Sequence, residues 1–282
     1  MKKSTQKFKK GILVFLTIGM LMLSLPITHA QEQTKDNSSV GELVEKRELF
    51  SKQFQNEDGT ITAVSYNYPI HYETSNGKMK DIDNTIINDV SYQPLGLSKQ
   101  VSKEQYYTSK DNPYIDVLFN KQTDSNNLIK INIDGYDVSW GISNLNNSTA
   151  TPLNDSETDS QYNLKNVTGG IKYTNAFENA DLYYYITSAN LKEEIILNEK
   201  SNINQIIYNI ETSLTPFKTE HNLVIFQNEN GDNIFSFQNP YMYDNAEKSS
   251  MTFDTTVDIK KTDNGYQLIY QLDTEWLNNE ER

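Results

Sequence analysis

The chain contains no cysteine, and this absence excludes several kinds of chemistry. Its 282 residues hold 0 Cys and only 3 His. There can be no disulfide framework, no thiol nucleophile, no thiolate zinc site and no lipid anchor on an N-terminal cysteine. A chain of this length can do without disulfides because it can bury a sizeable apolar core.

Histidine is almost as scarce. His29 lies in the N-terminal leader described below, which leaves His71 and His221. The chain has no Gly-x-Ser-x-Gly elbow and no His-Glu-x-x-His motif, and two histidines alone cannot build a histidine-rich zinc site. We expect both histidines to be structural or surface residues, and we predict no catalytic residue.

Basic residues are few outside the first ten positions. The chain has 25 Lys and Arg against 38 Asp and Glu, for a net charge of -13, and five of the lysines precede Gly11. Without those five, 20 basic residues face 38 acidic ones and the net charge is -18. Such a surface repels nucleic acid and anionic lipid, and no phosphate loop or dinucleotide fingerprint is present. We therefore predict no nucleic-acid partner.

The N-terminus has the three-part pattern of a secretory signal peptide. Lysines dominate Met1–Lys10, Gly11–Leu25 is almost wholly apolar, and Ala30 precedes polar Gln31. We predict a leader over residues 1–30 that is cleaved between Ala30 and Gln31, hence a secreted, extracellular protein. The apolar run is short for a bilayer and no second one follows, so we expect no membrane span after cleavage. An uncleaved N-terminal anchor is the alternative.

After the leader, alternation of apolar and polar residues dominates the chain. Ile129, Ile131 and Ile133 are one example, and Asn76-Gly77, Asn230-Gly231 and Asn264-Gly265 are typical hairpin turns. About twelve short strands spaced roughly ten residues apart predict an all-β, antiparallel, β-sandwich-like fold. No βαβ rhythm is present, which argues against an α/β enzyme.

Composition divides the mature chain into five segments. Val40–Phe50 could form a short helix behind Ser39 as N-cap, although an extended arm fits almost as well. The polar stretch 143–165 could be a long loop or the seam between two halves. The expected segments are a lead-in with that helix (31–54), a first β-rich half (55–142), the loop or seam (143–165), a second β-rich half (166–277) and a truncated tail (278–282).

Two groups of side chains are candidates for chemistry or binding. Glu193 and Glu194 are adjacent in an expected strand, so they point to opposite faces and cannot act as one dyad. In Tyr183-Tyr184-Tyr185 at least one ring must face outward. Exposed Tyr183 and Tyr185 could contact a surface ligand such as a sugar, although cross-strand packing is the better explanation of these tyrosines.

We predict no cofactor, with structural calcium as an open alternative. Asp81-Ile82-Asp83-Asn84 begins like a calcium-binding loop, but Ile86 stands where an EF-hand requires glycine. The acidic loop Asn228–Asn233 could hold calcium in an irregular way.

An ordered set of short stretches gives the chain a family resemblance. Together they resemble the N-terminal extracellular region of large Gram-positive wall-associated proteins of the Rhs/YD-repeat type, which often carry a domain named for its Asp-Asn-Arg-Leu-Arg-Glu motif. The resemblance covers residues 42–277. The stretches are Glu42–Arg47, Asp58–Val64, Pro69–Tyr72, Asn76–Thr85, Gly135–Gly141, Ile171–Tyr184, Leu191–Leu197, Asn239–Asp244 and Trp276-Leu277.

The resemblance implies a non-catalytic, β-rich module at the front of a secreted or wall-bound polypeptide. Its partners would be cell-wall material or the downstream domains of a larger surface protein. Family members can end in a toxin, but the sequence to Arg282 holds no YD repeats and no toxin domain, so we expect no toxin activity here. A carbohydrate-binding module or a cell-wall polysaccharide hydrolase is the alternative function.

Overall fold

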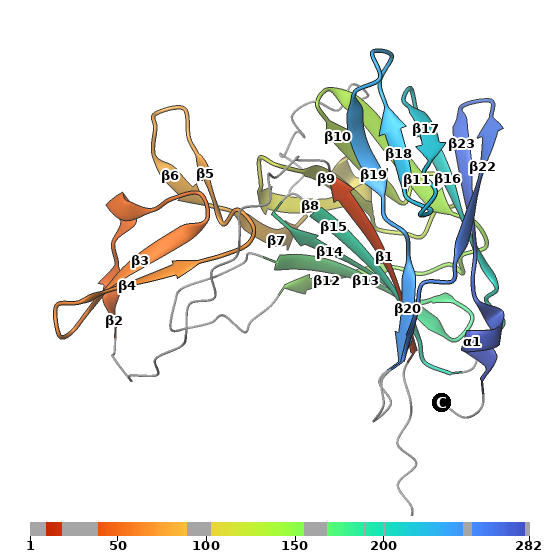
Figure 1. Cartoon of the computed structure of the whole chain (residues 1–282), viewed down its shortest axis with the longest axis horizontal. Helices are drawn as coiled ribbons and strands as arrows, with labels where there is room; N and C mark the ends of the chain where they lie inside the picture. The colour runs from red at the N-terminus through yellow and green to blue at the C-terminus, as the bar shows by residue number, and fades with distance from the viewer. Residues whose placement is uncertain are drawn as a thin grey trace, which may run out of the picture.

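The computed structural model describes residues 10–18, 39–88, 103–154, 168–188, 190–199, 201–244 and 250–279. These residues are mostly antiparallel β-strand, with one short α-helix, α1 (Thr274–Asn278). The predicted all-β, sandwich-like fold is confirmed. Figure 1 shows a body of two large sheets and a smaller N-terminal lobe at its side.

The larger sheet has ten strands, and its main path runs from β12 to β17. In spatial order the strands are β12 (Ala150–Asn154), β13 (Thr168–Phe177), β14 (Ala180–Thr187), β15 (Asn190–Leu197), β1 (Lys10–Ile18), β19 (Asn233–Phe237), β18 (Val224–Gln227) and β17 (Thr215–Lys218). Two more strands continue from β1, namely β20 (Tyr241–Asp244) and β21 (Met251–Thr252).

The second sheet has eight strands. In spatial order they are β22 (Thr256–Thr262), β23 (Gly265–Gln271), β16 (Gln205–Thr212), β11 (Tyr136–Ile142), β10 (Ile129–Ile133), β9 (Asp116–Asn120), β8 (Tyr106–Asp111) and β7 (Asp83–Ile87). Strands from both sides of residues 143–165 lie in this sheet, because β11 pairs with β16 along Val138–Ile142. The two halves expected from composition therefore share one sheet, and β12 lies within the stretch expected to be a loop or seam.

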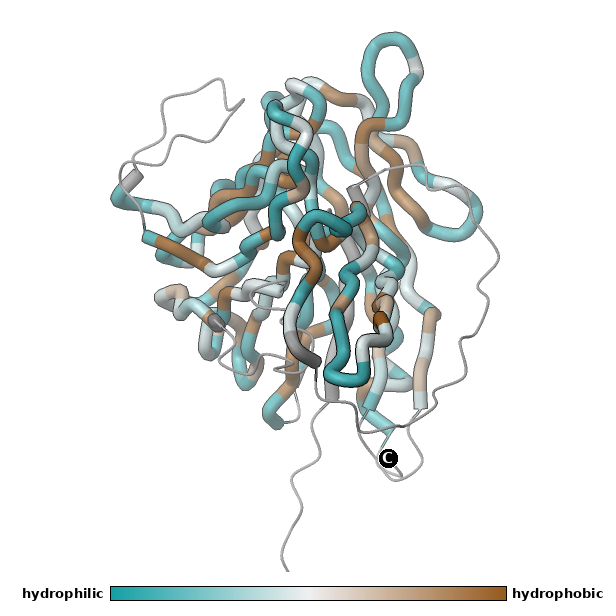
Figure 2. Tube along the Cα trace, turned by 90° about the vertical axis from the view of Figure 1, so that its left-hand side faces the viewer, coloured by the Kyte–Doolittle hydropathy of each residue, from teal (hydrophilic) through white to brown (hydrophobic). Residues whose placement is uncertain are grey.

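Aromatic side chains fill the space between the two sheets. Trp140 of β11 meets Phe237 of β19 edge to face, with ring centroids 5.8 Å apart. Phe119 of β9 meets Tyr184 of β14 at 6.1 Å, and Tyr208 of β16 also contacts Phe237 at 5.7 Å. All five side chains are buried. Such packing of two apolar sheet faces is what holds a sandwich together. In Figure 2 the hydrophobic stretches lie within the strands, and the hairpin tips are hydrophilic.

The N-terminal lobe consists of two small sheets. One holds β2 (Ser39–Glu42), β3 (Ser51–Asn56) and β4 (Ile61–Ser65), and the other holds β5 (His71–Glu73) and β6 (Met79–Asp81). The lobe is fastened to the body by hydrogen bonds. The Tyr72 hydroxyl donates to Asp111 at 2.7 Å, and the Tyr114 hydroxyl donates to the His71 carbonyl at 3.1 Å.

The short helix expected at Val40–Phe50 is wrong, and the extended alternative describes this stretch better. Residues Ser39–Glu42 form β2, followed by a single 3-10 turn, η1 (Val44–Lys46). A second 3-10 turn, η2 (Lys103–Gln105), precedes β8. The chain reverses at η1 because Arg47 binds back to Glu42, with Nε 2.6 Å from Oε1 and Nη2 2.9 Å from Oε2. A charge-assisted fork of this kind outweighs a weak local helix preference.

Part of the predicted leader lies in the larger sheet. Lys10–Ile18 forms β1, which is paired on both sides, while the predicted cleavage residues Ala30 and Gln31 lie outside the described residues. Among the helices of the described ranges, none has the length and apolar character needed to span a bilayer.

Candidate functional site

His71 is held in a structural environment rather than beside a nucleophile. Its side chain is fully buried, with Nδ1 2.6 Å from the backbone carbonyl of Glu48 and Nε2 3.4 Å from Oδ1 of Asp81. A catalytic histidine base would need a hydroxyl or thiol within reach. His221, the other candidate, lies on the surface beside Glu220.

Around His71 the lobe holds a cluster of charged side chains. Nζ of Lys52 lies 2.6 Å from Asp81, and Nη2 of Arg47 lies 2.8 Å from the same carboxylate. Glu42 completes the cluster through Arg47. Burial acts to raise the pKa of Asp81, but His71, Lys52 and Arg47 hold it well below its usual range. The cations and carboxylates neutralise one another, so this cluster leaves no net charge for a ligand.

Glu193 and Glu194 lie on opposite faces of β15 and therefore cannot form a catalytic pair. Glu193 is buried between the sheets, whereas Glu194 lies on the outer face. There Glu194 is bound by Nζ of Lys192 at 2.8 Å and by the Tyr243 hydroxyl at 3.3 Å. A two-carboxylate glycosidase needs both groups in one cleft.

The buried Glu193 is surrounded by tyrosines. The Tyr208 hydroxyl donates a hydrogen bond to its Oε1, and Tyr184 and Tyr270 are buried close by. Burial raises the pKa of Glu193 to about 7, against the lowering effect of the hydroxyls of Tyr184 and Tyr208. The carboxyl group is enclosed by the core, so its role is structural.

Tyr183 and Tyr185 lie together on the outer face of β14, while Tyr184 between them points inward. Their rings are stacked, with centroids 6.0 Å apart and planes inclined by 6°. Nζ of Lys172 lies 5.1 Å from the Tyr183 centroid, and Nζ of Lys192 lies 5.8 Å from that of Tyr185. These cations hold the rings in place, and both tyrosines remain partly exposed.

The same face carries more aromatic rings beyond β15 and β1. Tyr241 and Tyr243 of β20 lie 6.2 Å apart, and Tyr241 lies 5.5 Å from Phe253, which is 57% exposed. Direct register partners place Tyr183, Glu194 and Tyr241 in one row across the sheet. Three strand spacings separate the ends of this row, or roughly 14 Å. We call Tyr183, Tyr185, Tyr241, Tyr243 and Phe253 the aromatic face.

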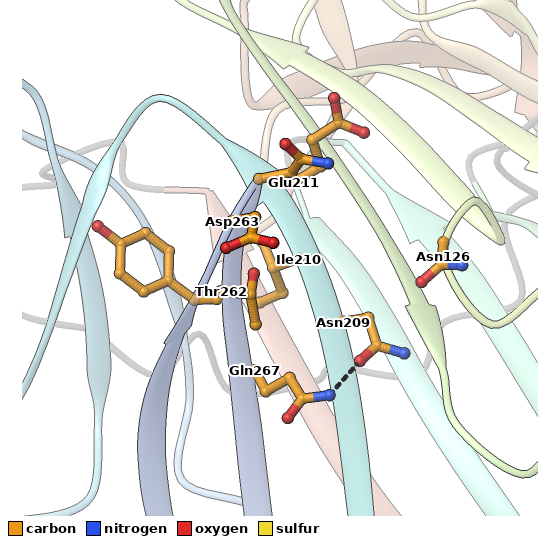
Figure 3. Close-up of a pocket in the computed structure, with 9 residues that line it drawn as sticks. Asn126, Asn209, Ile210, Glu211, Thr262, Asp263 and Gln267 are labelled. Carbon is orange, nitrogen blue, oxygen red and sulfur yellow. Dashed lines mark hydrogen bonds between the residues drawn. The ribbon is translucent and has the colours of Figure 1, made fainter.

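A polar pocket of about 480 Å³ lies on the second sheet (Figure 3). Asn209 of β16 and Gln267 of β23 form its floor, where Nε2 of Gln267 donates to Oδ1 of Asn209 at 2.8 Å. Asn209 also donates to the Ser125 carbonyl at 2.6 Å, which ties a loop to this floor. Nine residues line the pocket: Asn126, Asn209, Ile210, Glu211, Thr262, Asp263, Asn264, Tyr266 and Gln267.

Two glycines allow the walls of this pocket to come close. A Cβ on Gly141 of β11 would lie 2.3 Å from the backbone nitrogen of Asn126, so only glycine lets that loop cross the strand. A Cβ on Gly265 would lie 2.0 Å from the Ile210 carbonyl oxygen. Both contacts are too short for any larger residue.

The pocket suits a neutral, hydroxyl-rich ligand. Its lining offers amides, carboxylates, a threonine and a tyrosine, and none of the nine described lining residues is basic. An anionic ligand would meet the carboxylates of Glu211 and Asp263. The sequence did not single out these residues, because their proximity depends on which strands pair.

In the acidic loops considered for calcium, side-chain oxygens accept hydrogen bonds from other groups of the protein. In Asn228–Asn233, Oδ1 of Asn228 accepts from the backbone nitrogens of Asn230 at 3.0 Å and Asp232 at 2.9 Å. Asp83 accepts from Lys110 at 2.7 Å. Across the described ranges, no three His, Asp or Glu side chains gather in a way that could hold a metal ion. The expectation of no cofactor stays a prediction, with structural calcium as its alternative.

Comparison with known proteins finds three instructive relatives. The chain is 24% identical over its whole length to a tRNA3(Ser)-specific nuclease WapA of Bacillus spizizenii and 23% identical to a tRNA nuclease WapA of Bacillus subtilis. It is 21% identical to a wall-associated protein of Geobacillus stearothermophilus, over 72% of this chain and 75% of that protein. No family model and no solved structure matches the chain.

The extent of these matches differs between the relatives. The chain spans only 13% of the length of each of the two nucleases. The similarity to wall-associated proteins supports the expectation that this chain is the N-terminal region of a wall-associated protein. It also supports a wall or extracellular location. The more specific expectation, membership of the Rhs type with an Asp-Asn-Arg-Leu-Arg-Glu domain, stays a prediction.

Proposed function

We propose that this chain is an N-terminal wall-association module of a longer surface protein and that the module is itself non-catalytic. The match to a wall-associated protein over most of both chains carries the wall association. The two nuclease relatives, of which this chain matches 13%, support its place in a longer protein. The secretory leader pattern agrees with a module that works outside the cytoplasm.

The arrangement of the titratable side chains supports a non-catalytic role. His71 contacts a carbonyl and a carboxylate, and Glu193 is enclosed between the sheets away from Glu194. The polar pocket has no histidine, and the carboxylates of Glu211 and Asp263 are its only acids among the nine lining residues. At the described residues of these sites, no hydroxyl nucleophile is paired with a histidine base.

The tRNA cleavage named for two relatives belongs, in this proposal, to parts of those proteins outside the matched region. This chain corresponds to 13% of their length. The chain has 38 acidic and 25 basic residues, and this excess of negative charge also disfavours tRNA as a ligand of this region.

Binding and cleavage assays test the proposal together. Purified protein is mixed with insoluble Gram-positive cell wall and sedimented, and the supernatant is assayed for released sugar and peptide. A parallel reaction contains tRNA. We expect the protein in the wall pellet, no released fragments and intact tRNA. Protein that stays in the supernatant contradicts wall association, and released fragments or cut tRNA contradict the non-catalytic role.

A second candidate function, sugar binding, is favoured by the aromatic face. The stacked, partly exposed Tyr183 and Tyr185 present flat rings of the kind that pack against sugar rings, and Phe253 extends the apolar surface. The neutral, amide-lined pocket on the other sheet could hold sugar hydroxyls. We propose that wall glycan is the material recognised.

A further inference from the structure

Strand β1 joins the two parts of the larger sheet. On one side, Lys10–Thr17 pair residue by residue with Leu197–Asn190 of β15. On the other side, Lys10–Leu13 pair with β20 and Leu16–Ile18 pair with β19. All three pairings are antiparallel. Figure 1 shows β1 running through the middle of the body between β15 and β20.

Removal of the leader would remove this strand. In the described part of the chain, no other strand connects β15 to β19 or β20. Cleavage after Ala30 would leave the backbone groups along one edge of β15 unpaired, together with those of β19 and β20. Buried backbone donors and acceptors are almost always paired, and an open apolar edge is a site for strand addition.

We propose that the mature protein has a strand-acceptor slot between β15 and the β19/β20 pair. An apolar strand from the remainder of the longer polypeptide fills this slot after leader cleavage. The inference rests on the predicted cleavage and on the proposed place of this chain in a longer protein. Its ligand is therefore an extended segment of about eight residues, bound by main-chain pairing.

The slot dictates the character of the strand that enters it. On the inner face it is flanked by buried Leu191 and Ile195 of β15 and by buried Phe237 and Met242 on the other side. Alternate positions of the incoming strand must therefore be apolar. In β1, the register partners of these residues are Ile12 and Leu16.

One polar contact crosses the slot on its outer face. The Tyr243 hydroxyl of β20 donates to Glu194 of β15 at 3.3 Å, although β1 lies between their strands. Gly11 is the register partner of Tyr243 in β1. A small residue at this position leaves room for a ring to lie over the strand, so we expect a small residue there in the incoming strand too.

A strand from the same polypeptide is the occupant we assign. The two nuclease relatives are several times longer than this chain, which covers 13% of each. A covalently attached strand acts at an effective concentration of about 1 mM when its linker spans the distance. It would also close an edge that is otherwise prone to aggregation.

Cysteine crosslinking in the full chain tests the occupancy of the slot by β1. The chain has no native cysteine, so a Thr17→Cys/Asn190→Cys pair at directly opposite register positions reports on this contact alone. We expect an intramolecular disulfide on mild oxidation. A Thr17→Cys/Asp58→Cys pair, which joins β1 to a turn of the lobe, should give none. Equal crosslinking of both pairs, or of neither, overturns the inference.

Strand exchange tests whether the slot accepts another segment. A specific protease site placed at Ala30-Gln31 of the full chain allows the leader to be cut after folding. We expect the cut protein to bind a labelled peptide with the sequence of residues 10–18, and the uncut protein to exclude it. The same peptide with Val14→Pro lacks a backbone donor and should bind at least tenfold more weakly. Equal binding of both peptides, or none to the cut protein, overturns the slot.

A longer form of the protein tests the source of the strand. If the additional polypeptide fills the slot, the cut longer form should exclude the labelled peptide. Peptide uptake equal to that of the shorter chain would overturn the same-polypeptide assignment. These measurements use no wall material, so their failure is distinct from a failure of the wall-binding assay.

Discussion

The Tyr208 hydroxyl donates a hydrogen bond to the Glu193 carboxyl group between the two sheets, joining β16 of the smaller sheet to β15 of the larger one. Both side chains are buried. This bond places an ionisable group at the centre of the sandwich, where its charged form is disfavoured by burial.

Replacement of Glu193 by glutamine should change how stability depends on pH. The pKa of Glu193 is raised to about 7 in the folded protein, so the folded state holds the proton more tightly than the unfolded state. The free energy of unfolding therefore falls as pH rises from about 4.5 to 7, by about 3 kcal/mol from this group. Glu193→Gln cannot ionise and should lose this decline, as measured by urea unfolding at stepped pH.

Glu194→Gln is the matched control, because it alters the neighbouring residue on the outer face and keeps Glu193. It should retain the decline. If Glu193→Gln shows the same pH dependence as the original protein, the buried carboxyl group does not govern it.

Replacement of Asp81 by asparagine should destabilise the lobe at neutral pH. Arg47 and Lys52 would lose a shared carboxylate while their side chains stay mostly buried. Asp81 is itself partly exposed, so we expect a loss of about 2 kcal/mol rather than the larger cost of a fully buried pair. Since the pKa of Asp81 is lowered on folding, its contribution is present above about pH 4 and is lost as pH falls further.

Thermal unfolding at pH 7 and at pH 3 checks this prediction. The difference between Asp81→Asn and the original protein should shrink at the lower pH. Asp258→Asn, at an exposed position of β22, should have little effect at either pH. A loss of equal size at both pH values would contradict the role of the charge.

Replacement of Gly141 by alanine should disturb the polar pocket. The new Cβ would lie 2.3 Å from the Asn126 nitrogen, and relief of that clash must move the loop or the strand. Overpacking of this kind costs about 1–3 kcal/mol. Gly59→Asn is the control, because a Cβ at Gly59 meets nothing within 4 Å and asparagine tolerates its positive φ. If urea unfolding finds Gly141→Ala as stable as Gly59→Asn, the loop moves aside without a loss in the free energy of unfolding, which contradicts the prediction.

Loss of the stacked tyrosines should weaken wall binding more than stability. Tyr183→Ala/Tyr185→Ala removes two rings from the aromatic face, and we expect at least a fivefold loss of affinity for wall glycan in a sedimentation assay. Tyr66→Ala/Tyr68→Ala is a matched control, since this pair on the lobe has centroids 6.1 Å apart and is also partly exposed. If both double variants lose the same affinity for wall glycan, the aromatic face is not the binding surface.

Local patterns predicted the strands well because alternation and turn residues act within a few positions. Asn264-Gly265 lies where the hairpin of β22 and β23 turns, with Thr262 and Gly265 as register partners. Gly77 and Gly231 have φ of 75° and 86°, which glycine adopts readily. The helix expected at Val40–Phe50 was wrong because the distant Asp81 carboxylate and Glu42 draw Arg47 back across the turn.

Partners distant in the sequence explain what local patterns could not show. Asn209 and Gln267 were not singled out from the sequence, and the pairing of β16 with β23 makes them the floor of a pocket. Tyr183 and Tyr185 were considered as possible surface contacts, but the row that Tyr183 forms with Tyr241 depends on the order of four strands. The place of Lys10–Ile18 in the sheet likewise had no local signal.

The pairing of β11 with β16 has a mechanical consequence. Because these strands come from either side of residues 143–165 and run side by side along Val138–Ile142, tension along the polypeptide would load several main-chain hydrogen bonds at once. A single-molecule pulling trace should then show the two halves giving way in one rupture rather than in two successive steps.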